Sequence, residues 1–353
     1  MKKKKSKKKN PLFQVEKVPP SKRMRVIIAI YYLSFGLVIL SALLGIIPSI
    51  STFIWKYFDL PIKTILYFLS QFVIFKIGPI RGGLFYILII IALLLSFGSS
   101  VWYSYSKLSK KEKNRVFNIL QEASYIIITI CVVLVGNILT GQNHVKFDTL
   151  FFPEQEENVY TEDDLWQLNQ YLENKVVEYA YLMDRDEEGY IIHDDLGALA
   201  INDLKKASKK YWVLKGAYPK RVYDFDDYDL SHDPTTLGLT TVDNVGLSTE
   251  QEAPELLNTY THEYCHTKGV VRENEATLCS IIVGLESDNL LSQYSAYMEA
   301  YSRSSDAVFL LDSNRAREST KRINRLCTQN GYKEICNNGI QGVGHNKGRE
   351  DTF

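Results

Sequence analysis

Two histidines four residues apart, with a glutamate directly after the first, form the pattern in this sequence best suited to chemistry. They lie in the stretch His262-Glu263-Tyr264-Cys265-His266. On a helix, side chains four apart share a face, so both imidazoles can bind one metal ion. The glutamate between them can then deprotonate an attacking water. The pattern predicts a zinc site, because Zn²⁺ takes nitrogen, oxygen or sulfur ligands in a tetrahedral array.

A third ligand is expected from the segment that follows. Gly269 can end the motif helix and let the chain reverse, and residues 272–285 are predicted to form a second helix. Glu273 shares a face of that helix with small residues, which would allow close approach to the first helix. Glu275 shares its face with apolar residues, where an ionised carboxylate needs a partner. We favour Glu273 as the third ligand, with Glu275 as the alternative.

The start of the second helix is similar to an element of thermolysin-like and HtpX-like peptidases. The spacing Glu273-x-x-Ala276-Thr277 matches their Glu-x-x-(Ser/Ala)-Asp pattern up to its last position. In those enzymes the Glu binds zinc and the Asp supports a ligand histidine through a hydrogen bond. Thr277 stands where that Asp would be, so the resemblance does not supply the usual carboxylate.

The whole block from His262 to Thr277 resembles the signature of a bacterial membrane family catalogued as domain of unknown function 3810. That family is grouped with the zincin-like HExxH metallopeptidases. Its pattern is approximately H-E-x-x-H-x-x-G-x-x-R-E-x-E-A-N, and the chain matches every fixed position except the last, where Thr277 replaces Asn. The resemblance implies a zincin-like fold, a bound Zn²⁺ and membrane spans ahead of the motif, and it implies no substrate.

The N-terminal part of the chain has the composition of a membrane region. Three apolar runs, 26–50, 83–105 and 117–140, are each long enough to cross a hydrocarbon layer of about 30 Å. A fourth segment, 64–80, is also apolar but short, with Gln71 in its interior and Lys76 near its end. The three runs predict transmembrane helices.

The positive-inside rule decides how the fourth segment is interpreted. The first 25 residues hold eleven Lys or Arg and one acid, and the loop 106–116 holds five Lys or Arg and one Glu. Both segments belong in the cytoplasm, so an even number of crossings separates them. We therefore interpret 64–80 as interfacial or re-entrant. The span 117–140 then delivers everything after Gly141 to the outer side.

Charge is distributed unevenly along the chain. Residues 1–140 hold twenty Lys or Arg and four Asp or Glu, a net charge of +16, whereas 141–353 hold twenty-one and thirty-seven, a net charge of −16. The Lys-rich start is interpreted as a topogenic run that favours anionic lipid, and not as an arm for nucleic acid. We expect a multi-pass protein of the bacterial cytoplasmic membrane, with an extracytoplasmic catalytic domain, the lipid bilayer as a partner and no nucleic-acid partner.

The predicted organisation has four parts. Residues 1–25 are a basic cytoplasmic segment, 26–140 the transmembrane region, 141–336 an extracytoplasmic zincin-like domain and 337–353 a flexible tail. The fold class is α+β: N-terminal transmembrane helices followed by a mainly helical zincin-like metallopeptidase domain with a small β-sheet.

Several elements of the soluble part are predicted from local patterns. A capping-box-like start at Thr161 opens a helix, and the chain is β-like between about 211 and 250. Residues 236–248 are the candidate for an edge strand that pairs with an extended peptide, with an ordinary hairpin as an equal alternative. Further helices are expected at 196–211, 286–304 and 306–326.

The cysteines are weak signals. Cys265 and Cys279 lie on the two motif helices and are expected to be small core residues, although either could be a metal ligand instead. Cys327 and Cys336 could pair in an oxidising compartment.

A donor that stabilises the transition state is usually a Tyr or His near the metal. Tyr294, Tyr297 and His232 are the candidates in this sequence. The remaining histidines are expected to be surface or structural residues.

These observations predict a membrane-anchored zinc metallopeptidase that hydrolyses peptide bonds of envelope peptides or proteins outside the cytoplasmic membrane. Glu263 is its expected general base. Two alternatives stay open: a non-catalytic zincin-like envelope sensor or scaffold, and a zinc amidase that acts on cell-wall material. Glu263 favours an enzyme, because a site that only binds metal requires no general base.

Overall fold

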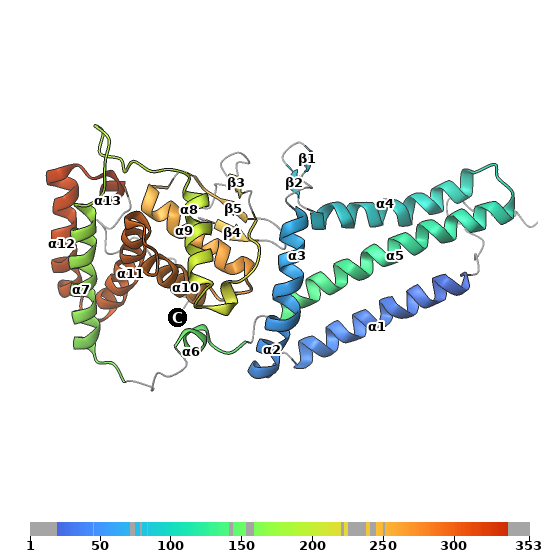
Figure 1. Cartoon of the computed structure of the whole chain (residues 1–353), viewed down its shortest axis with the longest axis horizontal. Helices are drawn as coiled ribbons and strands as arrows, with labels where there is room; N and C mark the ends of the chain where they lie inside the picture. The colour runs from blue at the N-terminus through green and yellow to red at the C-terminus, as the bar shows by residue number, and fades with distance from the viewer. Residues whose placement is uncertain are drawn as a thin grey trace, which may run out of the picture.

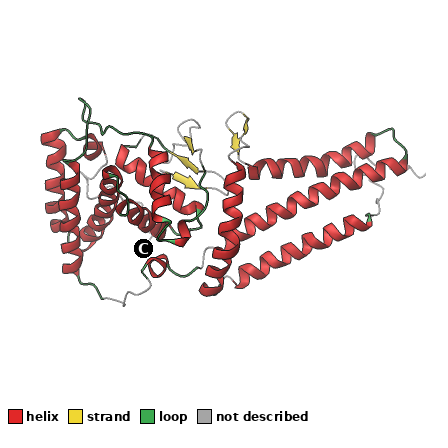
Figure 2. Ribbon diagram, in the orientation of Figure 1, coloured by secondary structure: helices red, strands yellow, loops and turns green. Residues whose placement is uncertain are grey.

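The computed structural model is mostly helical with a few short strands, and a bundle of long helices adjoins a broader helical domain (Figures 1 and 2). It describes residues 20–44, 46–70, 75–77, 80–82, 84–140, 144–152, 159–219, 222–224, 238–240, 245–249 and 251–337.

Three long helices form the bundle: α1 (Lys22–Leu44), α4 (Leu84–Tyr105) and α5 (Lys110–Thr140). Each contains a stretch long and apolar enough to cross a membrane. Helix α5 packs along both α1 and α4. Many apolar side chains of the bundle are exposed, as expected for helices whose outer surface is covered by lipid.

The first apolar run differs from the single span 26–50 that we expected. Helix α1 ends at Leu44, and Pro48 begins a second helix, α2 (Pro48–Ile54). Proline explains the break, because it disfavours helical conformation in the residue before it yet fits the first turn of a new helix. Helix α5 begins at Lys110, ahead of the expected start at 117, so the basic residues there form helical turns.

A π-helical turn, η2 (Trp55–Asp59), links α2 to helix α3 (Leu60–Ser70). Pro61 favours this turn because it lacks the N–H that an α-helix would bond four residues back, and the Leu60 N–H bonds to the Trp55 carbonyl instead. Helix α3 runs across the end of the bundle and not along it (Figure 1). The predicted interfacial or re-entrant segment 64–80 thus falls on α3 and on a hairpin, with 71–74 and 78–79 outside the described residues.

That hairpin consists of the antiparallel strands β1 (Phe75–Ile77) and β2 (Ile80–Gly82). We name residues 48–70, which form α2, η2 and α3, the junction, because they connect the bundle to the broader domain.

Helix α11 (Leu290–Leu311) is the centre of the broader domain, and four helices make the most extensive contacts with it. They are α7 (Glu162–Ala180), α9 (Ala253–Thr267), α10 (Glu273–Leu285) and α12 (Ser313–Asn330). The Asn289 and Asp312 side chains accept hydrogen bonds from the first N–H groups of α11 and α12. These caps set the helix starts, which differ from the expected ranges 286–304 and 306–326.

The remaining helices lie around this centre. The capping box expected at Thr161 is confirmed at the start of α7, where the Thr161 and Asp164 side chains each bond the other's backbone N–H. The helix expected at 196–211 ends earlier, as α8 (Leu196–Ala207). Two short helices, α6 (Phe147–Phe151) and α13 (Lys333–Asn337), complete the set.

A small sheet of three strands lies beside α9. Its strands are β3 (Val222–Asp224), β4 (Gly238–Thr240) and β5 (Val245–Leu247), in the order β3-β5-β4. Strand β5 is parallel to β3 and antiparallel to β4. The β-like residues Tyr211–Leu214 form a 3₁₀ turn instead (Trp212–Leu214), because a short apolar run specifies burial but not a strand.

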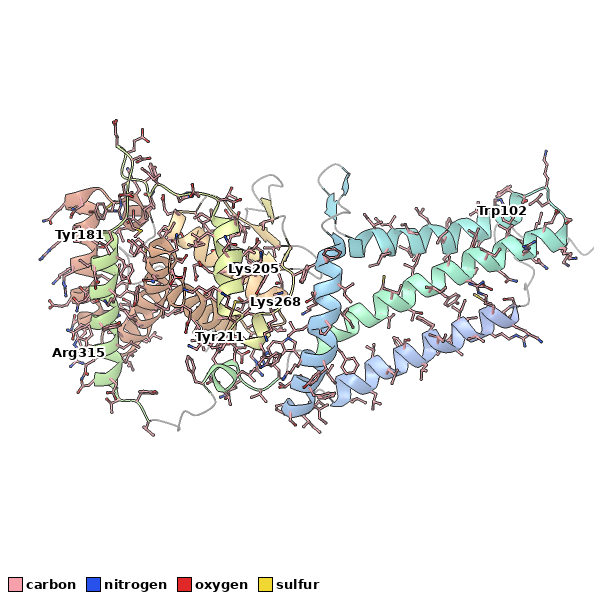
Figure 3. The ribbon with its side chains drawn as sticks, viewed as in Figure 1. Trp102, Tyr181, Lys205, Tyr211, Lys268 and Arg315 are labelled. Atoms are coloured by element: carbon pink, nitrogen blue, oxygen red, sulfur yellow. A yellow bond between two sulfur atoms is a disulfide. The ribbon has the colours of Figure 1, made fainter. Side chains whose placement is uncertain are left out.

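The junction and the broader domain share one hydrophobic core. Trp55 and Leu60 from the junction are buried in the same cluster as Phe147 and Tyr264. Figure 3 places Lys268 of the domain beside the junction and Trp102 of α4 near the opposite end of the bundle. The junction is therefore packed as part of the domain that carries the histidine motif.

The bundle geometry predicts which residues lie on opposite faces of a membrane. The start of α1 and the α4–α5 loop lie at one end of the bundle, and the chain after α5 leaves at the other (Figure 1). Cysteines introduced singly at 109 and 160 should react with an impermeant thiol reagent from opposite faces, in intact cells and in inverted vesicles. Cys131→Ser removes the one unpaired native thiol from the background. Labelling of both positions from the same face would contradict this arrangement.

Candidate metal centre

Helix α9 presents both histidines of the motif on one face. The Nε2 atoms of His262 and His266 lie 3.1 Å apart, and their ring centroids are 4.7 Å apart. This proximity follows from the four-residue spacing on a helix. The side chains are 15% and 13% exposed, so they are mostly enclosed but still reachable from solvent.

Glu273 reaches the same point from the next helix. The chain reverses after α9 at Gly269, whose φ of +92° favours glycine, and returns as α10. Glu273 Oε2 lies 3.1 Å from His262 Nε2, and Glu273 Oε1 lies 3.4 Å from His266 Nε2. The structure thus brings together His262, His266 and the glutamate that the helical-face argument favours.

The outer nitrogen of each imidazole has its own partner. His266 Nδ1 lies 2.5 Å from the Val270 carbonyl oxygen, to which it can only donate. His262 Nδ1 lies 3.4 Å from the Thr277 hydroxyl. A neutral imidazole that donates from Nδ1 keeps Nε2 as an acceptor. Thr277, at the position of the carboxylate in thermolysin-like enzymes, therefore still contacts a motif histidine.

Two imidazole nitrogens and the two oxygens of one carboxylate consequently lie close together: the Nε2 atoms are 3.1 Å apart, Oε2 is 3.1 Å from His262 Nε2 and Oε1 is 3.4 Å from His266 Nε2. In a tetrahedral zinc site with bonds of about 2.0–2.1 Å, neighbouring ligand atoms lie about 3.3–3.4 Å apart. Lone pairs at such distances repel one another unless a cation or a proton lies between them. The donor types and their spacing fit a zinc ion held by His262, His266 and Glu273.

The charges of the cluster favour positive charge at this point. When protons instead of a metal lie between these atoms, hydrogen bonds from His262 and His266 hold the pKa of Glu273 well below its usual range. Burial by itself lowers the pKa of His266, but the hydrogen bond to Glu273 and the nearby charge of Glu263 raise it overall. Protons and metal ions compete for such groups, because ligands bind metal in their deprotonated form.

Glu263 lies beside the two histidines and is only 4% exposed. One carboxylate oxygen and one nitrogen from each imidazole all lie within 4.8 Å of one another. Within the described residues, Glu263 thus forms with the two histidines a group compact enough to surround a metal ion. A buried carboxylate next to metal ligands is well placed to act as a general base.

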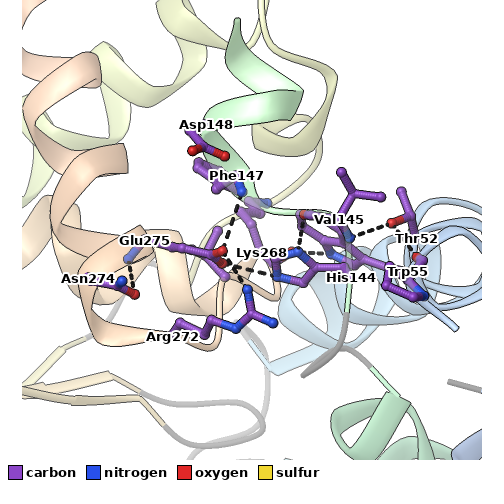
Figure 4. A network of polar contacts seen from close by, with 12 residues as sticks. Thr52, Trp55, His144, Val145, Phe147, Asp148, Lys268, Arg272, Asn274 and Glu275 are labelled. Atoms are coloured by element: carbon purple, nitrogen blue, oxygen red, sulfur yellow. Dashed lines mark hydrogen bonds and ion pairs between the residues drawn. The ribbon is translucent and has the colours of Figure 1, made fainter. Parts of the chain in front are cut away.

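Glu275, the alternative third ligand, is engaged elsewhere. Its Oε1 accepts hydrogen bonds from the Phe147 N–H at 3.3 Å and from the Arg272 guanidinium at 2.9 Å (Figure 4). Its Oε2 lies 3.4 Å from His144 Nε2. The contacts of Oε1 supply hydrogen-bond partners for this carboxylate on its apolar stripe, whereas Oε2 and His144 Nε2 face each other without a hydrogen bond. None of these contacts of Glu275 involves His262 or His266.

Two of the three candidate transition-state donors, Tyr294 and Tyr297, lie on α11 within the described part of the chain. The Tyr294 hydroxyl is fully buried and donates to Glu334 at 3.1 Å, and the Tyr297 ring packs against Tyr179 of α7. These two partners, Glu334 and Tyr179, do not belong to α9 or to the histidine motif. His232 lies outside the described residues.

Disulfide bonds join both cysteine pairs of the domain. Cys265 and Cys279, which we expected to be separate core residues, are paired across α9 and α10 with Cα atoms 6.5 Å apart. The reversal at Gly269 brings the two buried positions face to face, and a disulfide leaves no thiolate for a metal. Cys327 and Cys336 are also paired, with Cα atoms 5.1 Å apart.

Sequence reasoning missed the residues that hold the reversal between the two helices. The Trp55 indole N–H donates to the Lys268 carbonyl at 2.6 Å. The Lys268 side chain is itself buried, with its ammonium bonded to the Ala217 carbonyl and 3.7 Å from the centre of the Tyr218 ring. Burial lowers the pKa of Lys268 to about 7, and the charge of Lys63 adds to this effect. No local pattern signals contacts between residues so far apart in the chain.

Gly269 should tolerate alanine far less well than a glycine of similar conformation. A Cβ at Gly269 would lie 2.5 Å from Trp55 Nε1, whereas one at Gly331, with φ +71°, would meet nothing within 4 Å. Gly331→Ala should cost only the backbone term of about 1–2 kcal/mol. Gly269→Ala should cost about 1–3 kcal/mol more through the collision. Thermal unfolding of the detergent-solubilised full chain compares them, and equal losses would contradict the close approach of Trp55.

Comparisons with known proteins identify a family. The chain matches no curated protein and no solved structure. A family model described as "Protein of unknown function (DUF3810)" matches residues 56–338, which include most of η2, all of α3 and both helices of the candidate metal centre. The match covers most of the chain and agrees with the resemblance carried by His262 to Thr277. The chain therefore belongs to the DUF3810 family.

Proposed function

We propose that this protein is a membrane-anchored zinc metallopeptidase of the HExxH type. The convergence of His262, His266 and Glu273 on one point, with the buried carboxylate of Glu263 beside them, is the observation that carries the proposal. Two imidazoles and one carboxylate are a ligand set typical of catalytic zinc, which leaves one position open for chemistry.

The roles of the residues follow from their positions. His262, His266 and Glu273 hold the metal, which supplies Lewis-acid activation of water and polarises the substrate carbonyl. Glu263 accepts a proton from the water as its oxygen attacks the peptide carbonyl carbon. Glu263 then returns that proton to the amide nitrogen as the C–N bond breaks, so that an acid and an amine are released.

Strand β4 offers a place for an extended peptide. It packs against α9, and in the described part of the sheet it pairs with β5 along one edge only. A peptide can add to such an edge through backbone hydrogen bonds, which position it with little dependence on side chains. Strands β4 and β5 pair antiparallel, as in the hairpin that was the alternative for residues 236–248, of which 236–237 and 241–244 lie outside the described residues. The outer edge of β4 supports a polypeptide substrate within this proposal.

The catalytic domain is proposed to lie outside the cytoplasmic membrane, where envelope peptides or proteins are its substrates. The basic N-terminal segment and the basic α4–α5 loop favour the cytoplasmic side for one end of the bundle. The two disulfides support an oxidising compartment for the domain at the other end.

The two candidate third ligands should respond differently to loss of charge. Glu273→Gln should weaken zinc binding by more than about 100-fold, because it removes a ligand, whereas losses beyond the ligands are typically about 10–100-fold. Glu275→Gln changes a carboxylate two residues along the same helix and is the matched control. It should weaken zinc binding by no more than about 10–100-fold. Competition with a chromogenic chelator measures both dissociation constants. A larger effect of Glu275→Gln would assign the ligand to Glu275.

Glu263→Gln should separate metal binding from catalysis. The variant keeps a side chain of the same size, so zinc stoichiometry should stay near that of the wild type, while hydrolysis falls by at least about 100-fold through loss of the general base. Proteomic comparison of envelope proteins from wild-type and Glu263→Gln cells reveals the substrates, and purified protein tests direct cleavage. Equal cleavage patterns in the two strains would favour a sensor or scaffold over an enzyme.

A further inference from the structure

The reversal that carries the metal ligands is bonded to the junction. Trp55 lies in η2, and its indole N–H donates to the Lys268 carbonyl at 2.6 Å although the two residues are 213 positions apart. Trp55 is fully buried, so this hydrogen bond has no competition from solvent. A helix of the membrane region therefore fixes a backbone group in the turn between α9 and α10.

That turn also holds His266. Lys268 is followed by Gly269 and Val270, and the Val270 carbonyl accepts the hydrogen bond from His266 Nδ1. Movement of the Lys268 carbonyl would shift the Val270 carbonyl two residues later, and with it the orientation of the imidazole. Trp55 is thus linked to His266 in three steps. Its indole N–H bonds the Lys268 carbonyl, the backbone leads from Lys268 to Val270, and the Val270 carbonyl accepts the hydrogen bond from His266.

A second set of contacts holds the start of α10, which carries Glu273. Glu275 and Arg272 flank Glu273 and pair with each other at 2.9 Å, and Glu275 also accepts the Phe147 N–H and faces His144. Phe147 and His144 lie just after the last helix of the bundle. These contacts anchor the first turn of α10, and Glu273 is the first residue of that turn.

The two sets of contacts meet at the junction. The Trp55 and His144 rings stack with centroids 4.5 Å apart, and the Thr52 hydroxyl accepts the Val145 N–H at 2.9 Å (Figure 4). His144 is 1% exposed. The contacts that position His266 and the contacts that position Glu273 therefore depend on the same packed cluster. This cluster is formed by η2, the end of α2 and the segment after α5.

We propose that Trp55 and the His144–Glu275 pair are positioning residues of the metal centre, so that the junction completes the site. The proposal rests on the function proposed above, since it assumes that His262, His266 and Glu273 bind zinc. Trp55 fixes the turn behind His266, and Glu275 fixes the helix start that presents Glu273. Partners that orient ligands in this way typically contribute about 10–100-fold to metal affinity.

Conservative substitutions of the full chain in detergent test the proposal. Trp55→Phe keeps an aromatic ring for stacking but removes the N–H donor, and His144→Gln removes the ring that faces Glu275. Trp102→Phe, far along the bundle, is the control for the first. His193→Gln is the control for the second, because His193 Nδ1 contacts the next carbonyl at 2.7 Å just as His144 Nδ1 does, but His193 is exposed.

Zinc dissociation constants are measured by chelator competition, and the absorption spectrum of the Co²⁺-loaded protein reports the ligand geometry. Trp55→Phe and His144→Gln should each raise the dissociation constant about tenfold or more and change the Co²⁺ bands. The controls should match the wild type in both readouts. A purely structural role would lower the melting temperature of the chelator-treated protein and leave the affinity and spectrum of the folded protein unchanged.

The outcomes separate the two proposals. Failure of the wild-type chain to bind zinc would overturn the proposed function itself. Zinc binding by the wild type with unchanged affinity and spectrum in Trp55→Phe and His144→Gln would overturn only the positioning role. If one of these variants does not fold, Glu275→Gln takes its place, because it keeps the size of the side chain and weakens the contacts to His144 and Arg272.

Discussion

The central constraint in this structure is the convergence of three hydrogen-bond acceptors. The Nε2 atoms of His262 and His266 and the carboxylate of Glu273 lie 3.1–3.4 Å from one another, and lone pairs at that distance are stable only around positive charge. The neighbouring structure supports this arrangement: His266 Nδ1 donates to the Val270 carbonyl, which leaves its Nε2 as an acceptor, and the Thr277 hydroxyl contacts Nδ1 of His262.

Such a cluster needs a rigid frame, because a shift of about 1 Å between the helices would separate the acceptors. The frame has local and distant parts. The Cys265–Cys279 disulfide and the tight reversal at Gly269 connect α9 and α10 directly. The distant part is the junction, whose Trp55 enters the same core. In this family member, the junction and the domain that carries the histidine motif therefore share one core.

The sequence predicted those features that depend on residues close together in the chain. The four-residue spacing of His262 and His266, the glycine reversal and the cap at Thr161 each have a local cause, and the structure contains all three. The first apolar run was predicted too long, although Pro48 was a local signal of the break. The helical-face argument also identified Glu275 as a carboxylate in need of a partner.

Which residue is the partner of Glu275 could not be predicted from the sequence. His144 lies 131 positions before Glu275, and the contact between Trp55 and Lys268 spans 213 positions, so no periodicity links them. The same limit applies to Tyr294 and Tyr297, which stay candidate donors on the ground of residue type. Their contacts depend on how α11 packs against α7 and α13, which the local pattern does not specify.

X-ray absorption spectroscopy of the zinc-loaded full chain tests the central claim most directly, because it reports the atoms around the metal. The account predicts about two imidazole nitrogens and light oxygen neighbours at about 2.0–2.1 Å, with no sulfur at about 2.3 Å. The imidazole signal should fall by half in His262→Ala if that variant retains zinc. A sulfur shell, or a shell of oxygen alone without imidazole, would contradict a metal centre built from His262, His266 and Glu273.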